Sequence, residues 1–292
     1  MNRARAAEAL LAWNTLVWGA TFVVVKSALL NISPLYFLAL RFSLATVALL
    51  AIFRGVGKGP RDWKSVGIGA LIGSLLFSGF ITQTLGLRLT SAPKSAFITG
   101  LCSVLVPVIA GAVYRIRPQL AEVAGLLVAT AGMALMTLHG SLGSIGRGDL
   151  LTLLCAFGFA AHIVALGHYA DRISFELLAV TQVATMAVWS WALLWPLETP
   201  HARWRPSLVC AILVTGLVGT ALAYTIQAWA QRYTTSTRTA LIFMFEPVVA
   251  WLTSYFMTGE GLSGRAAAGA GMILGGVALV ELKPWISQPH PS

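Results

Sequence analysis

The feature that most constrains this chain is a series of apolar stretches, each about 20 residues long, separated by short polar connections. No water satisfies the backbone N–H and C=O groups inside a bilayer, so such a stretch crosses it as an α-helix. Charged residues make up 10% of the chain, against about 25% in soluble domains. The pattern predicts an all-α integral membrane protein with ten transmembrane helices, near residues 8–29, 34–53, 65–86, 93–114, 119–138, 149–169, 174–196, 207–230, 237–258 and 266–283.

The distribution of Lys and Arg predicts how these helices are oriented. With the N-terminus inside, twelve of these residues lie on the inner side and seven on the outer side, and cytoplasmic loops are the ones enriched in Lys and Arg. We therefore expect a multi-pass protein of a bacterial inner membrane with both termini in the cytoplasm. The formal net charge is +10, but the basic residues stand singly or in pairs between apolar segments. This pattern favours the lipid bilayer as a partner and excludes nucleic acid.

The two halves of the chain repeat each other. Residues of the first half recur 144 positions later: Arg88 as Arg232, Thr90 as Thr234, Lys94 as Arg238, Ala96 as Ala240, Gly125 as Gly269 and Gly132 as Gly276. We expect one five-helix repeat at 1–140, a second at 141–285 and a C-terminal tail at 286–292. Because five is odd, the second repeat enters the membrane from the opposite side. Inverted repeats of this kind enclose a central cavity, with the substrate near the midplane.

Short motifs along both halves resemble the drug/metabolite transporter superfamily, in particular its EamA-like ten-helix exporters. They are Trp18-Gly-Ala-Thr21 with Lys26, Leu40-Arg41-Phe42, Gln83 to Ala92, Ser95 to Leu101, Gln227 to Gln231, Phe245-Glu246-Pro247-Val248, and Gly259-Glu260 followed by Gly269 and Gly276. The resemblance implies a basket of ten helices, alternating access and export of small metabolites. The first half has Arg115 to Pro118 where the second has Gly259-Glu260, so a charged gate common to both halves is not expected there.

Charged and titratable groups within the spans are the main candidate site residues. A charge at the bilayer centre costs about 2.5 kcal/mol or more, and Glu246 is the acidic residue nearest the middle of a span. Pro247 follows it and predicts a kink. Glu246 is therefore either a proton-coupling or cation-binding group, or a locked structural carboxylate. Arg41 is its candidate structural charge partner, and His162 is a second coupling candidate because imidazole titrates near neutral pH.

Uncharged polar and aromatic residues complete the predicted substrate cavity. We expect hydrogen-bonding groups from Asn14, Thr21, Gln83, Tyr224 and Gln227, and flat apolar walls from Trp18, Phe97, Phe159 and Phe243. Such a pocket suits a small amphipathic solute, although each residue taken alone is equally consistent with helix packing. Small residues predict close helix approach, at Gly67, Gly69, Gly73, Gly269, Gly271, Gly275 and Gly276.

Motifs for other functions are missing from the sequence. It has no GxxxxGK[ST] phosphate loop and no HExxH or similar zinc spacing, and its three cysteines fall inside apolar stretches. We therefore expect no enzyme activity, no cofactor, no metal and no disulfide. The chain is predicted to be a secondary transporter, favoured as a monomer, that exports an amino acid, a drug-like molecule or another amphipathic solute, with protons as a possible coupling ion. A passive facilitator of the same fold and a non-transporting scaffold are the alternatives.

Overall fold

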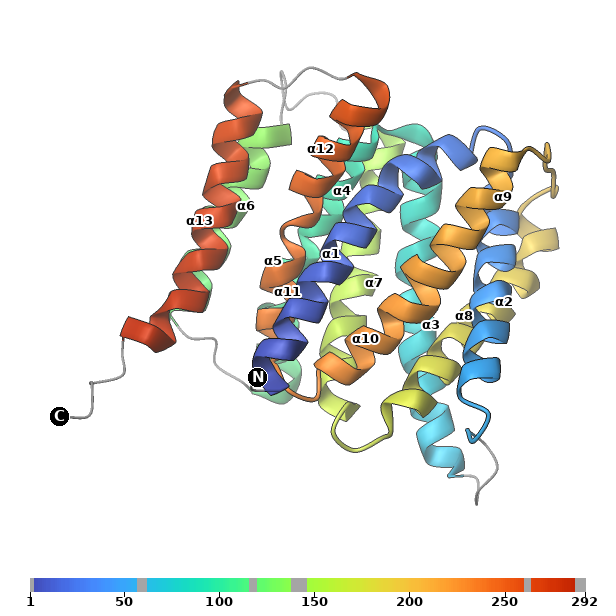
Figure 1. The fold of residues 1–292 in the computed structure, drawn as a ribbon, viewed down its shortest axis with the longest axis horizontal. Coiled ribbons are helices and arrows are strands. Elements are labelled where there is room, and N and C mark those ends of the chain that lie inside the picture. The colour runs from blue at the N-terminus through green and yellow to red at the C-terminus, as the bar shows by residue number, and fades with distance from the viewer. Residues whose placement is uncertain (1–2, 57–61, 116–119, 138–145, 260–263, 287–292) are drawn as a thin grey trace.

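A computed structural model describes residues 3–56, 62–115, 120–137, 146–259 and 264–286. The described residues fold into helices that run side by side in one bundle (Figure 1). In chain order these are α1 (Arg3–Ala28), α2 (Pro34–Ile52), α3 (Trp63–Leu89), α4 (Ala92–Gly100), α5 (Cys102–Tyr114), α6 (Leu120–Thr137), α7 (Arg147–Tyr169), α8 (Phe175–Leu197), α9 (Pro206–Leu213), η1 (Val214–Leu222), α10 (Ala223–Ala230), α11 (Ser236–Phe243), α12 (Glu246–Thr258) and α13 (Gly264–Ile286).

Eight helical segments of the described chain are long and apolar enough to cross a membrane. They are α1, α2, α3, α4 with α5, α7, α8, α9 to α10, and α11 with α12. Helices α6 and α13 occupy the places of the predicted fifth and tenth spans, and their apolar stretches are shorter, Val123–Leu135 and Ala267–Gly276. Leu16, Val47 and Phe256 point outward and are 57%, 65% and 81% exposed, which fits a surface that faces lipid. The predicted all-helical membrane fold is confirmed for these segments.

Three predicted spans are not single α-helices. The span expected at 93–114 divides at Leu101 into α4 and α5, and the span expected at 237–258 divides after Phe243 into α11 and α12. The span expected at 207–230 contains nine π-helical residues, η1, between α9 and α10. Apolar periodicity does not distinguish one long helix from two short ones placed end to end, so the sequence did not show these interruptions.

The helices pack in a regular set of pairs. Helix α3 lies against α7 and α8, α2 lies against α8 and η1, and α1 lies against α10 and α12. Helices α6 and α13 lie against each other along one edge of the bundle (Figure 1). Their backbones come so close that a Cβ atom on Gly276 would lie 2.5 Å from the carbonyl oxygen of Gly125. The prediction of close helix approach is therefore met at Gly276.

Several other glycines expected to allow close packing differ from one another. A Cβ atom on Gly73 would lie 2.5 Å from the carbonyl oxygen of Gln182, so α3 and α8 also meet backbone to backbone. At Gly67, Gly271 and Gly275 a Cβ atom would meet no described atom within 4 Å. The expectation was wrong at these three positions, because a glycine's partner depends on which face of its helix points to a neighbour.

Candidate functional site

A cavity lies where the two broken spans meet α1, α3, α7 and α10. Nine of the eleven residues predicted to face a substrate line it: Trp18, Thr21, Gln83, Phe159, His162, Tyr224, Gln227, Phe243 and Glu246. The space between the lining atoms amounts to about 740 Å³, including the portion that opens to the outside. The fold therefore brings residues from both halves of the chain to one place, while their role in binding a solute stays a prediction.

Both helix breaks border this cavity. Gly100 and Cys102 flank the break between α4 and α5, and Phe243 and Glu246 flank the break between α11 and α12; all four line the cavity. Cys102 and Glu246, the first residues of α5 and α12, are 144 positions apart, which is the spacing of the sequence repeat. Pro247 stands in the first turn of α12, where its missing N–H costs no helical hydrogen bond. The proline thus starts a new helix and does not merely kink a continuous one.

Glu246 is buried in the cavity wall and has no polar partner among the residues that the structure describes. Glu246 is 8% exposed. The described residues form two ion pairs, Lys94–Asp149 and Arg238–Glu8, and neither includes Glu246. None of the described side-chain hydrogen bonds reaches its carboxylate either. An isolated buried carboxylate is costly in its charged form, although the N-terminus of α12 favours negative charge. A carboxyl group in this position is ready to take up a proton or a cationic group.

Arg41 faces the same cavity and is held by η1, not by Glu246. The guanidinium Nε donates to Thr220 Oγ1 at 2.8 Å, and a terminal nitrogen donates to the carbonyl oxygen of Gly219 at 3.3 Å. Its Cζ lies 4.9 Å from the centre of the Phe80 ring, within the range of a cation–π contact. The ion pair with Glu246 expected from the sequence is therefore not formed. The π-helical turn presents two oxygens of η1 to Arg41, and π-helical turns are frequent at functional sites.

Aromatic rings form the apolar walls. The indole of Trp18 lies 5.2 Å from the Tyr224 ring and 5.0 Å, edge on, from the Phe243 ring. Its Nε1 donates to the carbonyl oxygen of Gly219 at 2.9 Å, so the ring is fixed in place. Elsewhere in the wall the rings of Phe80 and Phe159 meet edge on at 5.4 Å. These walls offer π faces to an apolar or cationic group.

Neutral polar side chains surround the rest of the cavity. His162 is hydrogen-bonded through Nε2 to Gln182 Oε1 at 2.9 Å, on α8. Gln227 donates to Gln231 at 3.0 Å, and Gln83 donates to Thr99 at 3.2 Å. Among the residues the structure describes, no three His, Cys, Asp or Glu side chains are grouped to hold a metal ion. The arrangement is suited to binding and releasing a solute.

Two predicted residues do not line the cavity. Asn14 is fully buried, and its Nδ2 donates to the carbonyl oxygen of Ala223 at 2.8 Å. Phe97 packs with Met133 and Leu241 in an apolar cluster on the side of α6 and α13. Both side chains lie on faces of α1 and α4 that point to neighbouring helices.

Phe80, Thr99 and Cys102 also line the cavity and were not predicted from the sequence, nor was the role of η1. Helical spacing could have predicted one of them, because Phe80 lies three residues before Gln83, on the same face of α3. Leu76, Thr84 and Leu87 continue that face and also line the cavity. The sequence held no comparable signal for η1.

Taken together, the apolar surface, the long helices and the cavity between them define a multi-pass helical membrane protein. Comparison with known proteins identifies its kind: the chain matches the EamA-like transporter family over residues 6–138 and again over residues 146–282. The chain therefore belongs to the EamA-like transporter family, whose members are membrane transporters. The predicted resemblance to the drug/metabolite transporter superfamily is confirmed.

Individual relatives agree with this assignment. An uncharacterized transporter of Archaeoglobus fulgidus is 33% identical over 94% of this chain and 85% of its own length. A WAT1-related chloroplastic protein of Arabidopsis thaliana is 26% identical over 93% of this chain and 69% of its own length. A protein of known crystal structure shares the fold, with a TM-score of 0.78 and 19% identity over 97% of this chain and 99% of that chain.

Proposed function

We propose that this protein is a secondary transporter that exports a small amphipathic metabolite, such as an amino acid or a drug-like molecule, across a bacterial inner membrane by alternating access. The observation that carries the proposal is the cavity at the two helix breaks. Its wall holds the carboxylate of Glu246, which has no hydrogen-bond or ion-pair partner among the described residues. Discontinuous helices mark the substrate and ion sites of secondary transporters. A cavity at both breaks gives a solute contact with both halves of the chain.

Inverted repeats of five spans each, at 1–140 and 141–285, would provide the two alternating states. The helix pairing supports this arrangement: α4 with α5 packs against α7, and α11 with α12 packs against α1. An offset of 144 positions relates α4 to α11, α5 to α12 and α1 to α7. The two contacts are therefore equivalent under the sequence repeat. The double match to the family supports the same division. In this scheme α6 and α13 are the fifth and tenth spans.

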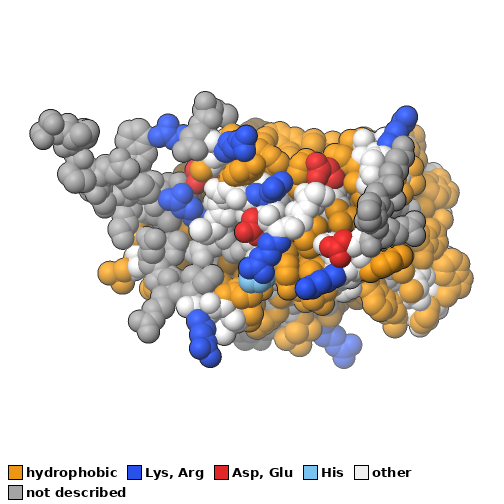
Figure 2. Space-filling model, turned by 90° about the horizontal axis from the view of Figure 1, so that it is seen from below, with side chains coloured by type: hydrophobic (Ala, Val, Ile, Leu, Met, Phe, Trp, Pro, Cys, Tyr) orange, Lys and Arg blue, Asp and Glu red, His pale blue; other side chains and the backbone are white. Residues whose placement is uncertain are grey.

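Orientation is proposed from the charges at the two ends of the bundle. Figure 2 views the end that carries the N-terminus, where Lys and Arg side chains, with fewer Asp and Glu side chains among them, are spread over the face, and hydrophobic side chains cover most of its right side. Arg3, Arg5, Arg54, Lys64 and Arg172 belong to segments that end or begin there. Positive loops favour the cytoplasmic side, which supports cytoplasmic termini.

Glu246 is the proposed coupling group. A carboxylate that has no fixed partner binds either a proton or the cationic group of a solute, and the two compete for one site. Arg41 remains bonded to Thr220 and Gly219, so it supplies a fixed positive charge that an anionic group of the solute meets. His162 is the less favoured candidate because it is already bonded to Gln182.

Transport into liposomes tests the proposal. Thermal-shift screening of the purified protein with amino acids and amphipathic cations selects a radiolabelled solute, and its uptake is then measured with and without an imposed pH gradient. We expect uptake above protein-free liposomes and accumulation driven by the gradient. Equilibration that ignores the gradient would instead indicate a passive facilitator, and a lack of uptake of any stabilising solute would indicate a non-transporting scaffold.

A further inference from the structure

Two ion pairs lie at opposite ends of the bundle, and each joins one half of the chain to the other. Lys94 Nζ, at the start of α4, lies 2.7 Å from Asp149 Oδ2 at the start of α7. Arg238, at the start of α11, has a terminal nitrogen 3.0 Å from Glu8 Oε1 near the start of α1. Helices α4 and α7 begin at the end opposite the N-terminus, whereas α1 and α11 begin at the N-terminal end (Figure 1).

The basic residues of these ion pairs are counterparts in the sequence repeat. Lys94 and Arg238 are 144 positions apart, and so are Ser91 and Thr235, whose hydroxyl oxygens accept from the backbone N–H of Lys94 at 3.4 Å and of Arg238 at 3.2 Å. Each capping residue therefore fixes the first turn of a broken span. The same local structure holds a basic side chain against the first helix of the other half, once at each end.

Each ion pair lies within a few helical residues of the cavity. Five residues separate Lys94 from Thr99 along α4, and five separate Arg238 from Phe243 along α11; Thr99 and Phe243 line the cavity. At a rise of about 1.5 Å per residue this distance is roughly 7.5 Å. A tilt of α4 or α11 about its break would separate the residues of one ion pair and leave the other pair in place.

We infer that Lys94–Asp149 and Arg238–Glu8 are the two gates of the transport cycle, opened alternately. The inference rests on the proposed function and adds four residues to it. Separating the halves at one end breaks one ion pair and uncovers the cavity on that side, and the remaining pair keeps the other side closed. Partly exposed ion pairs are weak enough to break and re-form, as a gate requires; the side chains of Lys94 and Arg238 are 34% and 29% exposed.

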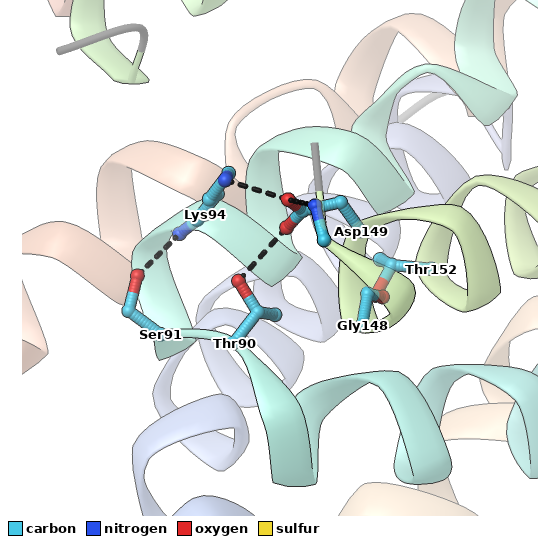
Figure 3. A network of polar contacts seen from close by, with 7 residues as sticks. Thr90, Ser91, Lys94, Gly148, Asp149 and Thr152 are labelled. Carbon is cyan, nitrogen blue, oxygen red and sulfur yellow. Dashed lines mark hydrogen bonds and ion pairs between the residues drawn. The ribbon is translucent and has the colours of Figure 1, made fainter. Parts of the chain in front are cut away.

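The two gates differ in strength. Figure 3 shows Asp149 at the centre of a small network: besides Lys94, it accepts from Thr90 Oγ1 at 3.0 Å and from the backbone N–H of Gly146 at 2.9 Å. Within the described chain, Glu8 accepts from Arg238 alone. Thr234, the counterpart of Thr90, has a buried hydroxyl with no hydrogen-bond partner among the described residues.

Accessibility of Cys102 tests the gates without knowledge of the solute, because this thiol lines the cavity. Cys155 and Cys210 are replaced by Ser, and the membrane-impermeant cation MTSET is added to right-side-out and inside-out vesicles. Lys94→Gln should raise the labelling rate from the Lys94 side at least threefold, and Arg238→Gln should do so from its own side.

Matched controls separate a gate from a general charge effect. Arg88→Gln and Arg232→Gln remove an exposed charge at the same two ends, are themselves 144 positions apart, and should change neither rate. The charge swap Arg238→Glu with Glu8→Arg should return the rates to those of the wild type, which also shows that the variants fold. Thr21→Cys provides a second reporter thiol in the cavity.

The outcomes distinguish failure of the gates from failure of the proposed function. Labelling from both sides at rates that no variant alters would refute the gates and leave the transport route standing. If neither reporter reacts from either side in any variant, no route reaches the cavity, and both the gates and the proposed function are refuted.

Discussion

The helices around the cavity and the pair formed by α6 and α13 differ in how they are held together. At the cavity, backbone contacts such as that of Gly158 with Gly79 are combined with side chains that bridge helices: Trp18 and Arg41 both reach across to the carbonyl oxygen of Gly219. Between α6 and α13 the backbones nearly touch, as at Gly276 and Gly125. Side-chain contacts can be exchanged for others, whereas backbone contact leaves no room for movement. We therefore expect the α6–α13 pair to be a rigid edge of the bundle.

The largest expected effect is that of Glu246→Gln on transport. The amide keeps the size of the side chain but neither releases a proton nor binds a cation. We expect transport to fall about a hundredfold, equivalent to roughly 2.7 kcal/mol, while the melting temperature in detergent stays equal or rises because a buried charge is removed. Glu176→Gln, at the start of α8 and away from the cavity, is the control. Full transport by Glu246→Gln would remove Glu246 as the coupling group.

Gly276→Ala tests the rigid edge. Its Cβ atom would meet the Gly125 carbonyl oxygen at 2.5 Å and the Ala129 nitrogen at 2.9 Å, and backbone atoms do not move aside cheaply. We expect a loss of about 2 kcal/mol in the free energy of unfolding, measured by denaturant or thermal unfolding in detergent.

Gly271→Ala is the matched control on the same helix. No described atom lies within 4 Å of its added Cβ, and alanine favours a helix over glycine by up to about 1 kcal/mol. The two substitutions should therefore change stability in opposite directions. Equal effects at both positions would contradict the backbone contact between α6 and α13.

Thr220→Val tests the support of Arg41 at the π-helical turn. Valine keeps the shape of threonine but removes the oxygen that accepts from Arg41 Nε at 2.8 Å. A buried donor left without a partner costs about 1–3 kcal/mol, so we expect a loss near the middle of that range in detergent unfolding. Thr46→Val is the comparison, since that hydroxyl donates to the Phe42 carbonyl oxygen of its own helix. Equal losses would mean that Thr220 contributes nothing beyond helix packing.

The smallest effect is expected for His162→Gln. Gln182 is the polar partner of His162 in the described structure, and a glutamine side chain preserves a hydrogen bond to it. We expect a change in transport of less than threefold, below about 0.7 kcal/mol, with an unchanged pH profile. A flattened pH profile in uptake assays would instead make His162 the coupling group and would weaken the case for Glu246.

The sequence by itself determined the membrane fold, the family and nine of the residues that line the cavity. Apolar length dictates helices in lipid, and the cost of burying charge singles out Glu246 and Arg41. The repeat spacing of 144 residues also marked Lys94 and Arg238 as counterparts.

Only the tertiary structure decided which groups meet. Asn14 is polar and Phe97 is aromatic, as expected of cavity residues, yet both side chains lie on helix faces that point to neighbouring helices. Arg41 bonds to η1 and not to Glu246, and Lys94 meets Asp149 across 55 residues of chain. Packing between segments far apart in the sequence sets the rotation of each helix and the positions of the helix breaks. The local periodicity of apolar residues does not predict that packing.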